Sequence, residues 1–135
     1  MSVLSNIPAQ AVLPLNAYDL AGLKRAAEAS DQVFMHADCS EASDKKSVLA
    51  AIGRGFEFPE HFGMNLDALY DCLTDLVANR RADKPGFLIV LERLPADDKL
   101  NVKARNALLD VFRDAADFFD DQGTAFRVFY SVIRP

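Results

Sequence analysis

Tryptophan is missing from the 135-residue chain, and cysteine occurs only as Cys39 and Cys72. Two cysteines cannot build a disulfide scaffold, and without a Cys-x-x-Cys pair they form no zinc-binding motif. Long apolar runs are also lacking, because Pro8 and Pro14 interrupt the uncharged N-terminal stretch, and no lysine or arginine precedes Lys24. A secretory signal needs a basic start, and a membrane helix needs about 20 apolar residues. We therefore expect a cytoplasmic protein with reduced thiols and no membrane contact.

Basic residues are fewer than acidic residues. Lysine and arginine number 15 against 20 aspartates and glutamates, which gives a net charge of -5 at pH 7. An acidic protein is repelled by phosphate backbones, so we expect no direct nucleic-acid binding and favour a basic protein as partner. The length fits one domain with a real core, and 50% of the residues are hydrophobic, as in an ordinary globular protein.

Hydrophobic periodicity predicts an alternation of strands and helices after an irregular N-terminal arm at residues 1–16. The expected strands are short apolar runs bounded by turn residues, at 33–37, 87–91 and 126–133. The expected helices begin near residues 17, 44, 65 and 95, the last with its main part at about 104–121. Ser43 or Asp44 can cap the second helix and Asn65 the third. This alternation calls for a small parallel sheet with helices packed on it.

The third expected helix has an apolar stripe that extends to Val77, and it also carries an acidic row. Asp67, Asp71 and Asp75 are spaced i, i+4 and i+8, which places them on one face. Each like-charge pair at that spacing costs roughly 0.2–0.5 kcal/mol in an isolated helix. No lysine or arginine occurs between Arg54 and Arg80 to neutralise the row. A solvated face would explain the pattern, and so would a surface whose counter-charges come from a partner; the pattern alone leaves both open.

A second acidic row belongs to the last expected helix and consists of Asp110, Asp114, Asp117 and Asp121, relieved only by Arg113. Two acidic ridges on one small domain would focus a negative field. Such a field speeds the encounter with a basic protein.

The sequence contains little that indicates a catalytic site. Paired carboxylates serve glycoside hydrolysis when they flank a cleft, whereas Asp67 and Asp71 lie one turn apart on one helix. A metal site built from these aspartates and His61 lacks a ligand-spacing motif. His36 is interpreted as a packed strand histidine, and a neighbouring carboxylate disfavours a thiolate at Cys72. Because no P-loop, nucleophile elbow or zincin motif is present, we expect no enzyme activity, no metal and no cofactor.

Residues 59–74, with the sequence PEHFGMNLDALYDCLT, closely resemble the signature of the barstar family, the inhibitors of barnase-like ribonucleases. The segments that follow are similar to the family in order, so the resemblance covers roughly residues 33–133. It implies an α/β fold in which a three-stranded parallel β-sheet is packed with helices, with an extra N-terminal helix in this chain. We expect a single globular unit made of an arm and extra helix at 1–30 and a barstar-like domain at 31–135.

The resemblance also implies a partner, a small basic ribonuclease of the extracellular type. We expect the chain itself to be a monomer. In the family the acidic helix and the preceding loop enter the active site of the enzyme. Carried over, Asp71 would stand where the substrate phosphate lies and meet the arginine, lysine and histidine of the enzyme, and Asp67 would meet further basic groups. The other contact residues predicted in this way are His61, Phe62, Gly63, Asn65, Tyr70, Thr74, Asp75 and Asp114.

Several positions depart from the family. His61 replaces a contacting tyrosine, Tyr70 replaces a tryptophan, and Phe118 aligns with a glutamate of the last helix. Asp75 and Leu76 stand where the family type protein has Gly-Trp. These changes point to a cognate ribonuclease other than barnase, and a non-inhibitory acidic binding module of the same fold remains the alternative.

Overall fold

The computed structural model describes residues 3–16, 18–59, 62–96 and 100–133. Within them, four parallel strands form one sheet: β1 (Gln10–Pro14), β2 (Val33–Asp38), β3 (Gly86–Leu94) and β4 (Ala125–Val132). The strands lie in the spatial order β1-β4-β3-β2, so β3 and β4 are central. Burial of these central strands on both faces accounts for the continuous apolar runs that predict them.

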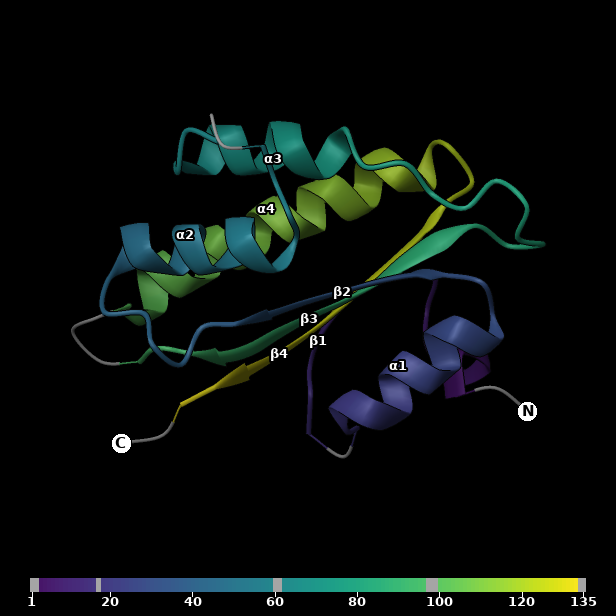
Figure 1. Cartoon of the computed structure of the whole chain (residues 1–135), viewed down its shortest axis with the longest axis horizontal. Coiled ribbons are helices and arrows are strands. Elements are labelled where there is room, and N and C mark those ends of the chain that lie inside the picture. Colours follow the sequence, from purple (N-terminus) through teal and green to yellow (C-terminus); the bar gives the residue numbers. More distant parts are fainter. Residues whose placement is uncertain (1–2, 17, 60–61, 97–99, 134–135) are drawn as a thin grey trace.

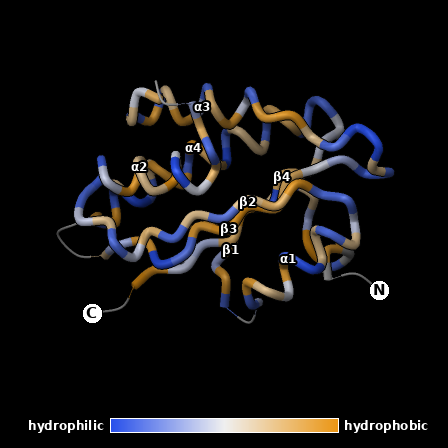
Figure 2. Tube along the Cα trace, viewed as in Figure 1, coloured by the Kyte–Doolittle hydropathy of each residue, from blue (hydrophilic) through white to orange (hydrophobic). Residues whose placement is uncertain are grey.

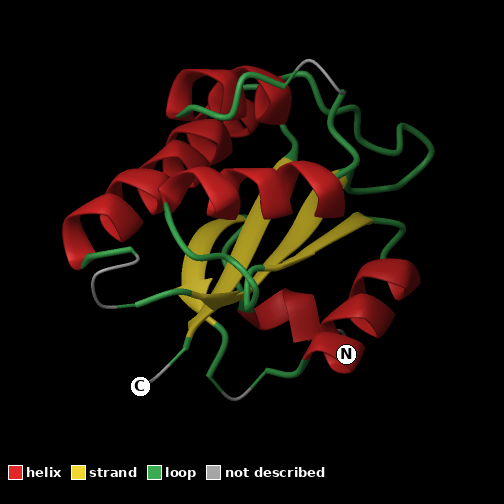
Figure 3. Ribbon diagram, turned by 60° about the vertical axis from the view of Figure 1, so that its left-hand side comes forward, coloured by secondary structure: helices red, strands yellow, loops and turns green. Residues whose placement is uncertain are grey.

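Helices cover both faces of the sheet and give the molecule three layers (Figures 1 and 3). One face carries α1 (Leu20–Ala29) and the short 3-10 helix η1 (Val3–Asn6). The other face carries α2 (Lys45–Gly55), α3 (Leu66–Thr74) and α4 (Val102–Asp120). In this second group α3 is outermost and packs on α4 rather than on the sheet (Figure 1). Within the described ranges, no helix combines the length and the apolar character that crossing a membrane requires.

The sheet separates two hydrophobic cores. The larger core, on the side of α2 and α4, includes Phe87, Ile89 and Phe126. The smaller core, under α1, includes Leu88 and Phe129. Successive strand residues point to opposite faces, so a single strand contributes to both cores. Figure 2 shows the hydrophobic residues gathered along the strands between the helical layers.

Each α-helix begins directly after a capping side chain. The caps are Asp19, Asp44, Asn65 and Asn101, each accepting a hydrogen bond from a backbone N–H of the first turn. Asp44 and Ser47 form a reciprocal capping box. The predicted caps at Asp44 and Asn65 are therefore confirmed. The helical region expected from Pro95 is not helical at Pro95 and Ala96, and its residues 97–99 lie outside the described residues. The helix begins at Val102, after the cap Asn101.

The expectation of a three-stranded sheet is wrong, because the described sheet has a fourth strand. The N-terminal arm, predicted to be irregular, contains η1 and β1, and β1 pairs with β4 in parallel from Gln10 opposite Phe126 to Pro14 opposite Tyr130. Proline is compatible with a strand at its ends on a sheet edge, where no ladder hydrogen bond is lost. Pro8 precedes β1 and Pro14 is its last residue, so the residues read as breakers mark the limits of an edge strand.

The third helix is shorter than its apolar stripe predicts. It ends at Thr74, with Asp75 as its C-cap, and Val77 is 70% exposed instead of packed inward. Leu76 N–H closes the turn by donating to the carbonyl of Leu73. The extension of the helix to Val77 is therefore wrong, whereas Asp75 still closes the last turn, because its N–H donates to the carbonyl of Asp71. A negative charge at a helix C-terminus opposes the helix dipole, which disfavours continuing the helix through Asp75.

Candidate functional site

The two acidic rows meet in one groove between α3 and α4, with a volume of about 700 Å³. We call it the acidic groove, and its carboxylates are Asp67 and Asp71 from α3 and Asp114, Asp117 and Asp121 from α4 and its C-cap. Its other lining residues are Leu66, Tyr70, Val111 and Phe118. Among these described lining residues none is basic. The surface thus joins a strongly negative rim to apolar and aromatic walls.

The buried sides of the two helices fix the direction of the groove carboxylates. On α3, Leu69 and Leu73 are both 0% exposed, so Asp67 and Asp71 are exposed on another face. On α4, the fully buried Phe112 marks the inner side, while the three groove aspartates are exposed. Because α3 packs on α4, the two exposed acidic faces border the same space.

The groove carboxylates lack counter-charges within the part of the chain that the structure describes. On the same helix, Asp110 lies outside the groove and forms an ion pair with Arg113, at 2.8 Å between Oδ1 and Nη1. Asp67 lies in the first turn of α3, where the helix dipole stabilises a negative charge. Asp71 has no such compensation. The arrangement concentrates negative charge and leaves it available to a cationic partner.

Two of the predicted contact residues serve the helix itself. Asn65 Oδ1 accepts a hydrogen bond from Ala68 N–H at 2.7 Å, so its side chain caps α3. Thr74 Oγ1 donates to the carbonyl of Tyr70 at 3.0 Å. Tyr70 lines the groove, whereas Asp75 is the exposed C-cap and does not line it.

The loop before α3 contributes a second surface. Phe62 packs edge-on against Phe58, with ring centroids 5.2 Å apart, and so faces a neighbouring hollow rather than the acidic groove. Gly63 is exposed and follows directly, and Met64 is 37% exposed. His61, also predicted as a contact, lies outside the described residues.

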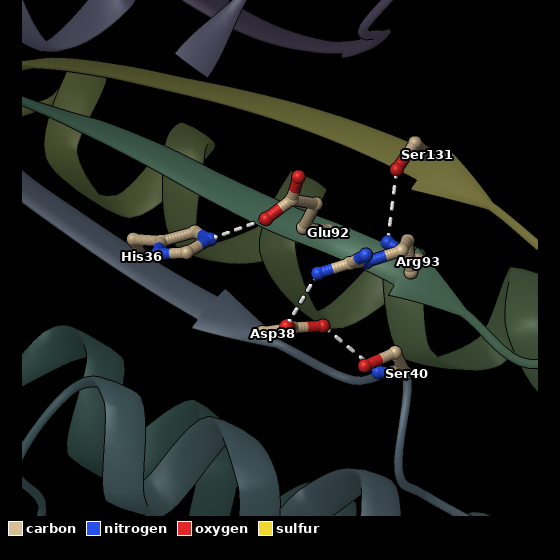
Figure 4. A network of polar contacts seen from close by, with 6 residues as sticks. All are labelled: His36, Asp38, Ser40, Glu92, Arg93 and Ser131. Atoms are coloured by element: carbon tan, nitrogen blue, oxygen red, sulfur yellow. Dashed lines mark hydrogen bonds and ion pairs between the residues drawn. The ribbon is translucent and has the colours of Figure 1, made fainter. Parts of the chain in front are cut away.

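A polar network at the carboxyl ends of β2 and β3 is a feature that the sequence analysis missed (Figure 4). His36 Nε2 lies 2.8 Å from Glu92 Oε1, and Arg93 Nη2 donates to Asp38 Oδ2 at 2.6 Å. The Arg93 backbone N–H donates to Ser131 Oγ on β4 at 2.8 Å. The parallel register, with His36 opposite Val90 and Asp38 opposite Glu92, brings these side chains together. Only knowledge of that register would have revealed the network.

We call His36, Asp38, Glu92 and Arg93 the paired cluster, because each of these side chains has a partner within it. The pKa of the Asp38 carboxyl is lowered, chiefly by the hydrogen bond from the Ser40 backbone N–H and also by Arg93. Arg93 adopts a φ of 57° where the register between β3 and β4 shifts, which is the geometry of a bulge. The cluster ties three strand ends together.

The thiols offer no activated nucleophile. Both cysteines are free, and burial raises the pKa of Cys39 to about 12. The pKa of Cys72 is also raised, by burial first and then by Asp75 and Asp71. A thiolate is the reactive form, so neither cysteine is prepared for catalysis. Across the described ranges, no three histidine, cysteine or carboxylate side chains are placed to hold a metal ion.

Comparison with known proteins matches the chain to a protein family and shows a likeness of fold to solved structures. A model of the family described as "Barstar (barnase inhibitor)" matches residues 32–131. No curated protein matches the chain. Among solved structures, the ORC2 protein of Aeropyrum pernix, in ADPNP-ADP complexes, is similar over 92% of this chain with a TM-score of 0.50 and 18% identity. The chain spans 35% of the length of that protein, and at this identity the likeness concerns the fold alone.

Proposed function

The chain belongs to the barstar family, and on that premise we propose that it inhibits a small basic ribonuclease by placing the acidic groove over the enzyme's active site. The observation that carries the proposal is the convergence of two acidic rows on one groove whose described lining residues include no basic side chain. Charges left without partners in the free protein are available to a partner that supplies them. A ribonuclease active site does so, because it holds fixed positive charges that bind phosphate.

Asp71 is the central anchor in this proposal. It stands in the middle of α3, lines the groove and is exposed. Arginine recognises a carboxylate and a phosphate with the same two-pronged hydrogen-bond geometry, so Asp71 can occupy the place of a substrate phosphate. Asp67 on one side and Asp114 across the groove would meet further basic groups. Because α3 is folded and capped before binding, little ordering entropy opposes the complex.

The apolar part of the groove supports close packing around the ion pairs. Tyr70 and Phe118 line it beside the carboxylates. Aromatic side chains that exclude water strengthen neighbouring charge pairs at an interface. We assign the outer contacts to the loop and helix ends, through His61, Phe62, Gly63, Asn65, Thr74 and Asp75.

The acidic groove belongs to one part of the chain. Both walls of the groove lie within residues 31–135, so we assign the inhibitory surface to that part and regard residues 1–30 as an addition to it. We further propose that the protein has no catalytic activity, acts as a monomer and works in the cytoplasm. There an inhibitor of an extracellular-type ribonuclease would protect cellular RNA.

The test is a titration of the purified protein into a panel of small basic microbial ribonucleases, with RNA cleavage as the readout. We expect stoichiometric inhibition of at least one enzyme and a large loss of inhibition in Asp71→Ala. The matched control is Asp110→Ala, which removes an aspartate from α4 that lies outside the groove and is paired with Arg113. Inhibition by the control should equal that of the wild type.

One observation favours a second function. Phe118 lines the groove at a position where the family resemblance places a glutamate, which makes this end of the groove more apolar. A non-inhibitory module of the same fold would bind a basic protein without blocking RNA cleavage. Folded protein that inhibits no ribonuclease in the panel would overturn the inhibitor proposal and favour this alternative.

A further inference from the structure

Arg127 is a buried cation without a counter-charge in the described structure. It is the third residue of β4 and is 9% exposed. Its Nη1 donates to Gln32 Oε1 and its Nη2 to the Ile7 carbonyl, both at the long distance of 3.4 Å. Its Nε atom is buried and has no hydrogen-bond partner. No described carboxylate forms an ion pair with it.

An isolated guanidinium is costly to bury, because the charge loses its water and gains little in return. Burial accordingly lowers the pKa of Arg127, with no charged neighbour contributing to the shift. Buried charges in proteins are ordinarily paired or hydrogen-bonded. Arg127 has two weak neutral acceptors instead, so a partner that brings a negative charge would be strongly favoured.

A pocket of about 500 Å³ lies against Arg127. Its lining residues include Gln32, Pro85 and Thr124, each of which directly precedes a strand. These amino ends of the strands lie at the right-hand end of the sheet in Figure 1. The polar lining of the pocket includes Gln10, Gln32 and Thr124, and its apolar walls include Ala9 and Pro85. Pockets that hold small molecules typically measure about 300–1,000 Å³ and combine apolar walls with a few polar groups.

We propose that this pocket binds a small organic molecule through a single carboxylate or phosphate group that pairs with Arg127. A bare inorganic anion would leave most of the volume and the apolar walls unused, so the ligand has an apolar body. Asp83 and Asp120 also line the pocket and are exposed, as is Lys84. These rim carboxylates would repel a ligand with several negative charges, which favours one anionic group over a polyphosphate.

The pocket is separate from the surface proposed for the ribonuclease, because it shares no lining residue with the acidic groove.

The pocket is lined by two parts of the chain. Leu4, Ala9 and Gln10 come from the N-terminal segment, whereas Arg127 and Thr124 belong to the region that the family model matches. A ligand here would link the N-terminal segment to the rest of the sheet and increase the stability of that contact.

The test is a binding experiment by nuclear magnetic resonance on the full chain at constant ionic strength. The probes are benzoate and hexanoate as carboxylates, phenyl phosphate as a phosphate, and benzyl alcohol as a neutral compound of similar shape. We expect at least one anion to give saturable shifts of the Gln32 and Thr124 amide signals, and benzyl alcohol to give none. The comparison of benzoate with phenyl phosphate decides which anionic group the pocket takes.

Two variants locate the binding group. Arg127→Met keeps an unbranched side chain but removes the charge, and we expect binding to weaken roughly tenfold or more, since a charge-assisted hydrogen bond is lost. Lys84→Met removes an exposed rim cation, and we expect a change of less than about threefold. Ribonuclease inhibition should be unchanged in Arg127→Met, so this test and that of the acidic groove can fail independently.

The proposal is overturned if no anion gives a saturable shift in the folded wild-type protein, or if Arg127→Met binds as tightly. Should that variant not fold, the Nε–H signal of Arg127 in the wild type provides the decision. It should move when the anionic probe is added, because an anion paired with the guanidinium changes the electrostatic environment of this N–H. Movement with benzyl alcohol as well, or no movement with any of the anionic probes, would equally overturn the assignment.

Discussion

At the carboxyl ends of β2 and β3, four polar side chains form two close pairs, His36 with Glu92 at 2.8 Å and Arg93 with Asp38 at 2.6 Å. Between α3 and α4, five carboxylates line one groove, and none of them forms an ion pair with another described residue. Both regions are polar, but their side chains have different effects on the stability of the fold. In the paired cluster, charge holds strand ends together. In the acidic groove it opposes the local structure, since like charges on neighbouring turns repel.

The side chains of the paired cluster thus stabilise the fold, whereas the carboxylates of the acidic groove are available to bind a partner. Removing a charge from the paired cluster should cost stability and leave partner binding unchanged. Removing one from the acidic groove should do the reverse. Each of the following experiments tests one side of that contrast.

The largest expected effect is on the rate of association with the ribonuclease. Replacing Asp114, Asp117 and Asp121 together by asparagine should lower the association rate constant roughly tenfold or more at low ionic strength, because the steering field is lost. The difference should shrink towards 1 M salt, where charges are screened beyond about 3 Å. Stopped-flow fluorescence at several salt concentrations measures both effects.

A matched control removes the same net charge elsewhere. It combines Glu28→Gln, Asp31→Asn and Glu41→Gln, three exposed residues outside the acidic groove. An equal loss of rate in this control would mean that net charge, and not the groove, steers the encounter.

The next effect concerns the cap that holds the groove wall. Asn65→Ala removes the acceptor of the Ala68 N–H, and we expect it to lower the free energy of unfolding by about 1 kcal/mol, the usual cost of a lost N-cap. Urea denaturation measures the change. Asn106→Ala, at an exposed position inside α4, is the control and should be neutral or slightly stabilising, because alanine is the better helix former.

Features that depend on interactions between residues close in sequence could be predicted. Caps such as Asn65 and the acidic spacing of Asp67 and Asp71 are local, and both were predictable. The buried central strands were predictable too, because burial on both faces leaves a continuous apolar run. The strand β1 was missed because Pro8 and Pro14 signal a break, and only its pairing with β4 shows that they bound a strand.

The parts that the sequence could not provide depend on contacts between distant elements. The acidic rows on α3 and α4 were each visible, yet their convergence on one groove depends on how the helices pack. The paired cluster depends on the register between β2 and β3. Arg127 lies in a strand whose neighbours are buried apolar residues, and nothing in its local pattern indicates a buried, unneutralised cation.

The paired cluster provides the third prediction. Asp38→Asn should destabilise the protein by about 0.5–1 kcal/mol at pH 7, since the pair is partly exposed. Because the pKa of Asp38 is lowered in the folded state, its stabilisation is fully present above the unfolded pKa of about 3.9. It is lost as the pH falls through the lower folded pKa. Urea denaturation at several pH values should show the variant and the wild type converging on acidification, and an undiminished difference in acid would contradict the assigned cause.

The smallest effect tests the contrast within a single helix. Asp117→Asn removes a groove carboxylate that lies three residues after Asp114, four before Asp121 and near the C-terminal end of α4. We expect it to stabilise the free protein by about 0.2–0.5 kcal/mol, because it relieves like-charge repulsion and an unfavourable dipole interaction. Asp110→Asn breaks the pair with Arg113 and should destabilise by a similar amount. Thermal unfolding of both variants measures the sign of each change in stability. Opposite signs for the same substitution on one helix would mean that the groove carboxylates oppose the fold. Destabilisation by both would mean that Asp117 has a stabilising contact of its own.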